Sequence, residues 1–183
     1  MSNGNDNGTS FPLAPMSPLM LTLTTVIYAV TAIIVIGALA GATALAIPAV
    51  LIAVLYAWIW LRFRPTRFTV HTGGLAIEWP MRRVEIPLAD IADARILDKE
   101  QLKTAIGWGL RVGAGGLWGG FGRLWTKHRG LIHLYISRTD RFVWIERRHG
   151  KPWLITPDRP EEFVVVIDRQ STPGTESDMD TQK

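Results

Sequence analysis

Two long apolar runs dominate the first third of the chain. Residues 19–40 contain no charge and no proline, and residues 44–61 are also uncharged. At about 1.5 Å per helical residue, the first run is roughly 33 Å long, which is enough to cross a bilayer core of about 30 Å. Only three residues, 41–43, separate the runs, so two helices here would be antiparallel neighbours. The pattern predicts a transmembrane hairpin over residues 19–62.

Charges around this hairpin predict its orientation. Asp6 is the one charged side chain before residue 62, whereas Arg62, Arg64 and Arg67 follow the second run directly. Basic residues that flank a span favour the cytoplasmic side. We therefore expect a two-pass membrane protein with both termini in the cytoplasm. A signal peptide fits less well, because the first 18 residues lack Lys and Arg and the apolar run exceeds the usual core of about 7–15 residues.

From residue 67 onward, apolar and polar residues alternate with the two-residue period of half-buried strands. Leu75, Ile77 and Trp79 share one face of their segment, and Pro87 indicates an edge strand or a bulge farther on. Tight turns at 138–140 and 148–151 predict successive antiparallel hairpins. The predicted strands lie at 68–70, 75–79, 84–88, 91–97, 131–137, 141–146 and 153–156. We expect their large side chains, Trp79, Trp144 and Trp153, to be buried in one core.

A single helix is predicted to close this domain over residues 159–168. Asp158 and Glu161 have the spacing of a capping box, and Phe163 and Ile167 form an apolar stripe. The β-branched run at 164–166 lowers helix propensity, so a strand is the alternative. The flanking residues 1–18 and 170–183 are rich in small and polar side chains and are predicted to be disordered.

Residues 104–129 form the most unusual segment, because glycine and tryptophan alternate there with basic residues and no acidic residue occurs. It is either an irregular loop or hairpin whose tryptophans fill the core, or a loop that contacts the membrane with aromatic and basic side chains. Its candidate lipid- or partner-binding residues are Arg111, Arg123, Lys127, Arg129, Trp118 and Trp125.

Composition narrows the range of functions. Residues 62–170 hold 19 Lys and Arg against 12 Asp and Glu, a net charge of +7 that favours anionic lipid headgroups or an acidic protein surface. Attachment to a membrane argues against nucleic acid. The absence of cysteine excludes disulfides, thiol catalysis and cysteine zinc sites.

No pattern of catalytic or metal-ligating residues stands out. The four histidines show no helical i, i+4 pair. Ser137, Asp140 and His133 contain the groups of a catalytic triad, but Ser137 lacks the nucleophile-elbow signature. We expect no catalytic, cofactor-binding or metal-binding residues and no enzymatic activity.

The domain resembles the bacterial pleckstrin-homology-like (bacterial PH) domains, in the form in which two spans precede one such domain. The resemblance rests on the order of the motifs at 67–70, 73–75, 86–91, 120–123 and 153–163. It implies a mainly-β domain at 64–169 with about seven antiparallel strands in a bent sandwich or open barrel, plugged by a C-terminal helix. The resemblance does not indicate which ligand the domain binds.

Two functional hypotheses follow. The first is a non-catalytic binding or scaffold module, anchored in the bacterial cytoplasmic membrane that the resemblance implies, which docks to anionic lipid or to a membrane or cytoplasmic protein partner. The alternative is an accessory subunit of a membrane complex that binds through its transmembrane hairpin.

Overall fold

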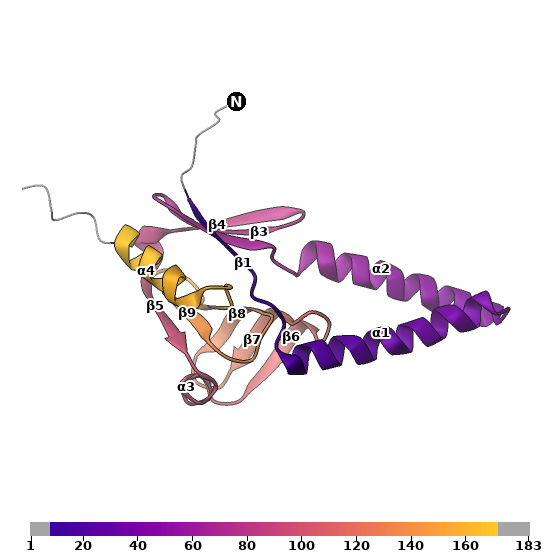
Figure 1. Ribbon diagram of the computed structural model, residues 1–183. Helices are drawn as coiled ribbons and strands as arrows, with labels where there is room; N and C mark the ends of the chain where they lie inside the picture. The colour runs from indigo at the N-terminus through magenta and orange to yellow at the C-terminus, as the bar shows by residue number, and fades with distance from the viewer. Residues whose placement is uncertain (1–7, 172–183) are drawn as a thin grey trace, which may run out of the picture.

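The computed structural model describes residues 8–171 and the side chains of all of them except Arg111 and Ala114; it consists of a helical hairpin joined to a β-rich domain (Figure 1). α1 (Pro18–Leu39) and α2 (Ala46–Arg62) are antiparallel and are joined through a short 3-10 turn at Thr43–Leu45. Both helices are long and apolar enough to cross a membrane. Their apolar side chains are mostly exposed, whereas a core helix of a soluble protein would bury them.

The expectation of a disordered lead-in does not hold for the residues just before α1. β1 (Thr9–Pro12) pairs antiparallel with β2 (Arg67–His71), with Phe11 opposite Phe68. Hydrogen bonds from Ala14 N to Thr156 O (2.9 Å) and from Asp158 N to Pro12 O (2.9 Å) fasten the following residues to the domain. The predicted disorder of residues 1–7 and 172–183 lies outside the described residues.

The helical hairpin is therefore an insertion between two paired strands of one sheet. That sheet has the order β1-β2-β3-β4, with β3 at Gly74–Trp79 and β4 at Arg82–Pro87. Pro87 is the last residue of the edge strand β4, as its lack of an N–H predicts.

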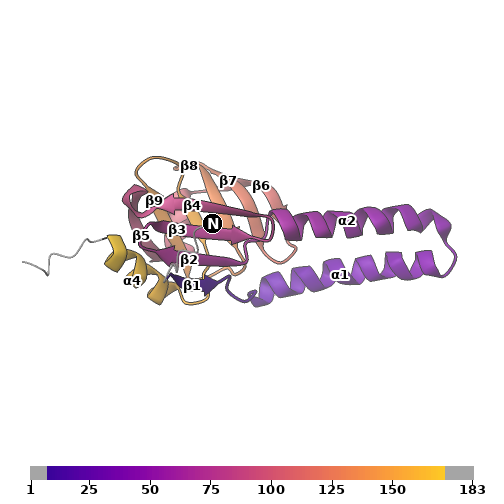
Figure 2. The same ribbon diagram turned by 90° about the horizontal axis from the view of Figure 1, so that it is seen from above.

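A second sheet packs against the first, and the two enclose the main core (Figures 1 and 2). Its order is β5-β9-β10-β8-β7-β6. These strands are β5 (Ile91–Leu97), β6 (Gly109–Gly115), β7 (Gly120–Thr126), β8 (Gly130–Ile136), β9 (Phe142–Arg147) and β10 (Trp153–Ile155). A 3-10 turn at Leu88–Asp90 links the two sheets.

The strand predictions hold in their positions but not in all of their pairings. β8 and β9 do not form a hairpin, because β10 lies between them, parallel to β8 and antiparallel to β9. The described residues contain ten strands, more than the seven expected, and no closed barrel. The predicted class, a helical hairpin followed by a mainly-β PH-like domain with a C-terminal helix, is confirmed.

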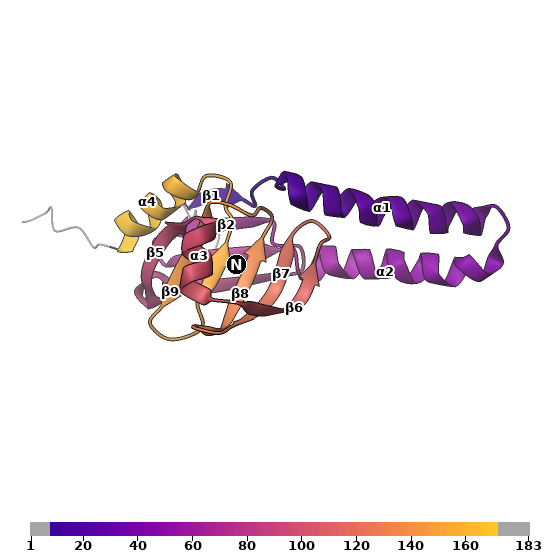
Figure 3. The ribbon, with the colours of Figure 1, turned by 90° about the horizontal axis from the view of Figure 1, so that it is seen from below.

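Two helices complete the domain. α4 (Pro160–Ser171) inserts Phe163 and Ile167 between the sheets at the end opposite α1 and α2 (Figure 2), which settles the helix-or-strand alternative in favour of helix. α3 (Lys99–Ile106), which the strand pattern did not predict, covers the outer face of the six-stranded sheet over a second apolar cluster around Trp144 (Figure 3). Trp79, Trp144 and Trp153 are all buried, as expected.

Candidate functional site

The glycine- and tryptophan-rich segment is ordered as the hairpin of β6 and β7. Its tip, residues 116–119, lies against the helical hairpin. The Thr24 hydroxyl of α1 donates to Gly116 O (3.2 Å) and accepts from Trp118 N (3.0 Å). Trp118 is 8% exposed and its ring packs edge-on against Tyr28, Tyr56 and Trp60. The segment therefore joins the domain to both helices through its tip.

The other tryptophans of this segment are at the opposite end of the hairpin. Trp108 is 63% exposed and Trp125 45% exposed, and their rings contact each other edge-to-face. The three tryptophans thus divide into one buried side chain at the helices and two exposed ones away from them.

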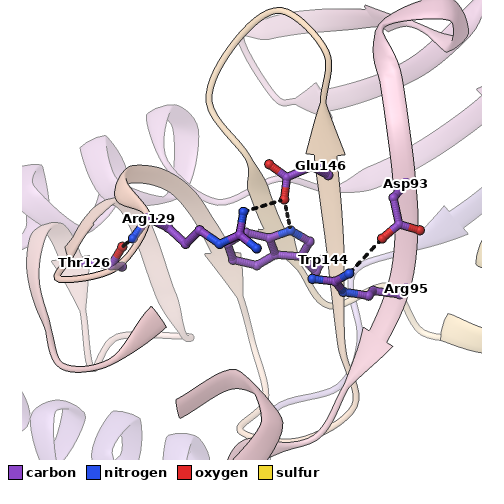
Figure 4. A network of polar contacts seen from close by, with 6 residues as sticks. All are labelled: Asp93, Arg95, Thr126, Arg129, Trp144 and Glu146. Atoms are coloured by element: carbon purple, nitrogen blue, oxygen red, sulfur yellow. Dashed lines mark hydrogen bonds and ion pairs between the residues drawn. The ribbon is translucent and has the colours of Figure 1, made fainter. Parts of the chain in front are cut away.

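The candidate basic residues do not form a single patch. Arg129 lies on the outer face of the six-stranded sheet, where its guanidinium pairs with Glu146 (3.4 Å), which also accepts from the Trp144 ring nitrogen (Figure 4). Lys127 is exposed in the turn after β7. Arg111 lies in β6 opposite Leu124, and its side chain is outside what the structure describes. Arg123 alone of the described candidates lies in a cleft.

This cleft is formed where the C-terminal end of α2 meets the two sheets, and its volume is about 390 Å³. α2 contributes Trp58 and Arg62, and Phe63 follows directly after the helix. β4 contributes Arg82, and β6, β7 and β8 form the opposite wall. The lining residues are Trp58, Arg62, Phe63, Arg82, Val112, Gly113, Gly122, Arg123, His133 and Tyr135. Three of them are arginines and none is acidic.

Arg82 is held in place by aromatic side chains. Its guanidinium lies over the Trp79 ring at 3.9 Å, and Nη2 donates to the Tyr135 hydroxyl (3.2 Å). Its Nε is buried without a hydrogen-bond partner among the described residues. A guanidinium fixed in this way presents donors to the cleft at little further entropic cost.

Two glycines keep the cleft open on the β6–β7 side. Gly113 and Gly122 face each other across the two strands, with φ of +147° and +128°. A β-carbon on Gly113 would lie 2.3 Å from Phe121 O, and one on Gly122 would lie 2.7 Å from Val112 O. Only glycine fits this backbone, and the strand pair therefore adds no side chain to the cleft at this point.

His133 lies in the wall of the cleft, close to several basic side chains. Its ring stacks on Trp153 with centroids 4.4 Å apart, and Arg123 is its partner on β7. Burial, followed by repulsion from Arg123, Lys151, Arg147 and Arg82, lowers the pKa of His133 to about 4. The imidazole is therefore neutral at pH 7 and adds no positive charge.

This depressed pKa predicts an acid-sensitive stability. In the unfolded chain, His133 has its ordinary pKa of about 6.5 and binds a proton more readily than in the folded protein. The free energy of unfolding therefore decreases as the pH falls from about 6.5 towards 4. We expect His133→Gln to flatten this part of the pH profile of thermal unfolding, and the exposed His128→Gln to leave it unchanged. An equal loss of stability between pH 7 and 4.5 in wild type and His133→Gln would contradict the assignment.

The groups that resemble a catalytic triad have structural roles. Ser137 is buried, and its hydroxyl donates to Ala14 O (2.5 Å), which fastens the segment before α1. Asp140 pairs instead with Arg138 (2.6 Å). Within residues 8–171, no group of three His, Asp or Glu side chains is arranged to hold a metal ion.

From the sequence alone, Arg62 indicated only the orientation of the helices. Arg83 pairs at the surface with Glu78 at 3.6 Å, whereas its neighbour Arg82 lines the cleft. The spacing of Trp79 and Arg82 across a tight turn was the available signal for their stacking.

Comparison with known proteins identifies the domain. A family model described as "Bacterial PH domain" matches residues 66–171, more than half of the chain. Comparisons with curated proteins and with solved structures find no significant match.

Proposed function

Because the chain belongs to the bacterial PH domain family, we propose that it is a membrane-anchored, non-catalytic binding and scaffold module. In this proposal it docks to anionic groups at the inner face of the bacterial cytoplasmic membrane. The observation that carries the proposal is the arginine-lined cleft at the base of two exposed apolar helices. Arginine fits this task because its planar fork of donors matches carboxylate and phosphate oxygens.

Membrane anchoring is supported by the way the helices join the domain. The pairing of β1 with β2 requires both outer ends of the helical hairpin to lie on one side of a membrane. Arg62, Arg64 and Arg67 lie at that end, which favours the cytoplasm. Arg64 also stacks on Trp60, with its guanidinium carbon 4.3 Å from the ring centre, an arrangement suited to the headgroup level.

The topology is testable because the chain has no cysteine of its own. Ser2→Cys and Ser177→Cys are expected to react with a membrane-impermeant maleimide only after the cells are lysed. Ala42→Cys, between the helices, is expected to react in spheroplasts. Labelling of Ser2→Cys or Ser177→Cys in intact spheroplasts would overturn the cytoplasmic assignment.

A further inference from the structure

A second hollow adjoins the cleft and has a different character. It is an apolar groove of about 430 Å³ lined by Trp58, Leu61, Arg62, Met81 and Arg82. Trp58, Arg62 and Arg82 line both hollows, so the two lie side by side. The exposed Met81 lies in the turn between β3 and β4, which Figure 2 shows beside the C-terminal end of α2.

Among the described residues, none of Arg62, Arg82 and Arg123 has a carboxylate within ion-pair distance, so no acidic side chain competes with a bound anion for the three arginines of the cleft. Other arginines of the domain are engaged in such pairs, namely Arg67, Arg83, Arg95, Arg129, Arg138, Arg141, Arg147 and Arg159. Cations gathered without a counter-charge repel one another, and a bound anion offsets that repulsion.

We propose that the cleft and the groove together bind one anionic phospholipid, with its phosphate on Arg62, Arg82 and Arg123 and its glycerol and upper acyl chains along Leu61 and Met81. This inference rests on the membrane-anchored function proposed above. A soluble phosphate compound would use the cleft alone. The adjoining apolar groove, next to the end of a predicted span, is the feature that selects a lipid.

The lining also predicts which headgroups are preferred. Choline and ethanolamine headgroups carry a cation, and no carboxylate lines either hollow to pair with it. The arginines that line the cleft repel such a cation. Phospholipids with a net negative charge and no amine, such as phosphatidylglycerol, fit this lining best.

The test compares two charge reversals on one strand and its turn. Arg123→Glu changes the cleft, whereas Lys127→Glu reverses another exposed positive charge four residues farther on. Full-length protein in a neutral detergent is titrated with phosphatidylglycerol, phosphatidylcholine or glycerol 3-phosphate, and bound ligand is counted by native mass spectrometry. Thermal unfolding of each variant verifies that it is folded.

Wild-type protein is expected to bind phosphatidylglycerol more tightly than phosphatidylcholine. Arg123→Glu is expected to weaken phosphatidylglycerol binding roughly tenfold to a hundredfold, the value of a charge-assisted hydrogen bond. Lys127→Glu, at an exposed position, is expected to weaken it by less than about threefold. Met81→Asp, in an exposed turn, places a charge in the groove and is expected to weaken lipid binding even if Arg123→Glu proves unstable.

Three results would overturn the proposal: equal losses in Arg123→Glu and Lys127→Glu, equal binding of the two phospholipids, or glycerol 3-phosphate binding as tightly as phosphatidylglycerol. The last result would assign the cleft to a soluble phosphate compound. Lipid binding in detergent does not depend on which side of a membrane the termini occupy. Failure of this test is therefore distinguishable from failure of the topology test.

Discussion

A soluble domain that begins at residue 64 is expected to be far less stable than one that retains β1. Phe11 is completely buried, and its ring contacts Phe163 of α4 edge-to-face with centroids 5.2 Å apart. Loss of β1 removes this side chain and also exposes the backbone edge of β2. Truncating a buried Phe alone costs about 3–5 kcal/mol, against a total stability of about 5–15 kcal/mol for typical domains.

The measurement uses two soluble proteins. One contains residues 64–171, and the other joins residues 8–14 to residue 64 through a short Gly-Ser linker that replaces the helical hairpin. We expect the second to unfold cooperatively at a higher denaturant concentration, and Phe11→Ala in it to abolish most of the gain. Ser10→Ala in the same strand provides the control. Equal midpoints for the two proteins would show that β1 contributes no stability.

Trp118→Ala is expected to have the second-largest effect, a loss of about 3–5 kcal/mol from the full-length protein. Trp118 fills the space between the β6–β7 tip and three aromatic side chains of the helices. Its φ of 59° is a conformation that costs a non-glycine residue about 1–2 kcal/mol. The packing of its ring offsets this cost.

Trp108→Ala provides the matched control, because Trp108 belongs to the same segment but is exposed and contacts only Trp125 among the aromatic rings described. Its loss is expected to cost no more than about 1 kcal/mol. Thermal unfolding in detergent gives the comparison. Similar losses for the two variants would mean that the tip does not join the domain to the helices.

The alternation of apolar and polar residues predicted most of the strands, because successive side chains of a strand point to opposite faces of its sheet. In β8, Ile132, Leu134 and Ile136 face the cluster under α3, whereas Tyr135 faces the core between the sheets. The sequence shows this alternation even though both faces of β8 are covered, one by the other sheet and one by α3. The position of β10 between β8 and β9 was not visible, since pairing across 20 residues depends on the whole sheet rather than on local spacing.

Besides β6 and β7, two elements were not predicted, for different physical reasons. β1 has a single large apolar residue, Phe11, among small and polar ones, and only pairing with β2 makes it a strand. α3 did carry a local signal: Asp98 accepts from Gln101 N (2.7 Å) and Gln101 Oε1 accepts from Asp98 N (3.0 Å), which is a capping box. The glycine-rich stretch that begins at Gly107, directly after this helix, favoured an irregular segment instead.

The candidate site was predicted only in part, because it is made by segments far apart in the chain. Arg123 was chosen from a basic segment that lacks acidic residues, yet Arg129 of the same segment finds Glu146 on β9. Charge counting within one segment cannot reveal a partner supplied by another strand. Arg62 and Arg82 join Arg123 only once α2 and β4 are packed beside β7.

The insertion of the helical hairpin between paired strands also determines when the domain can be completed during synthesis. β1 leaves the ribosome first, but residues 13–66 must follow before β2 is available to pair with it. In the proposed topology, a chain whose second helix failed to insert would leave the two strands on opposite sides of the bilayer. Phe11 would then never reach Phe163. In that topology, completion of the β-domain depends on correct membrane insertion, and a misinserted chain remains exposed to proteolysis.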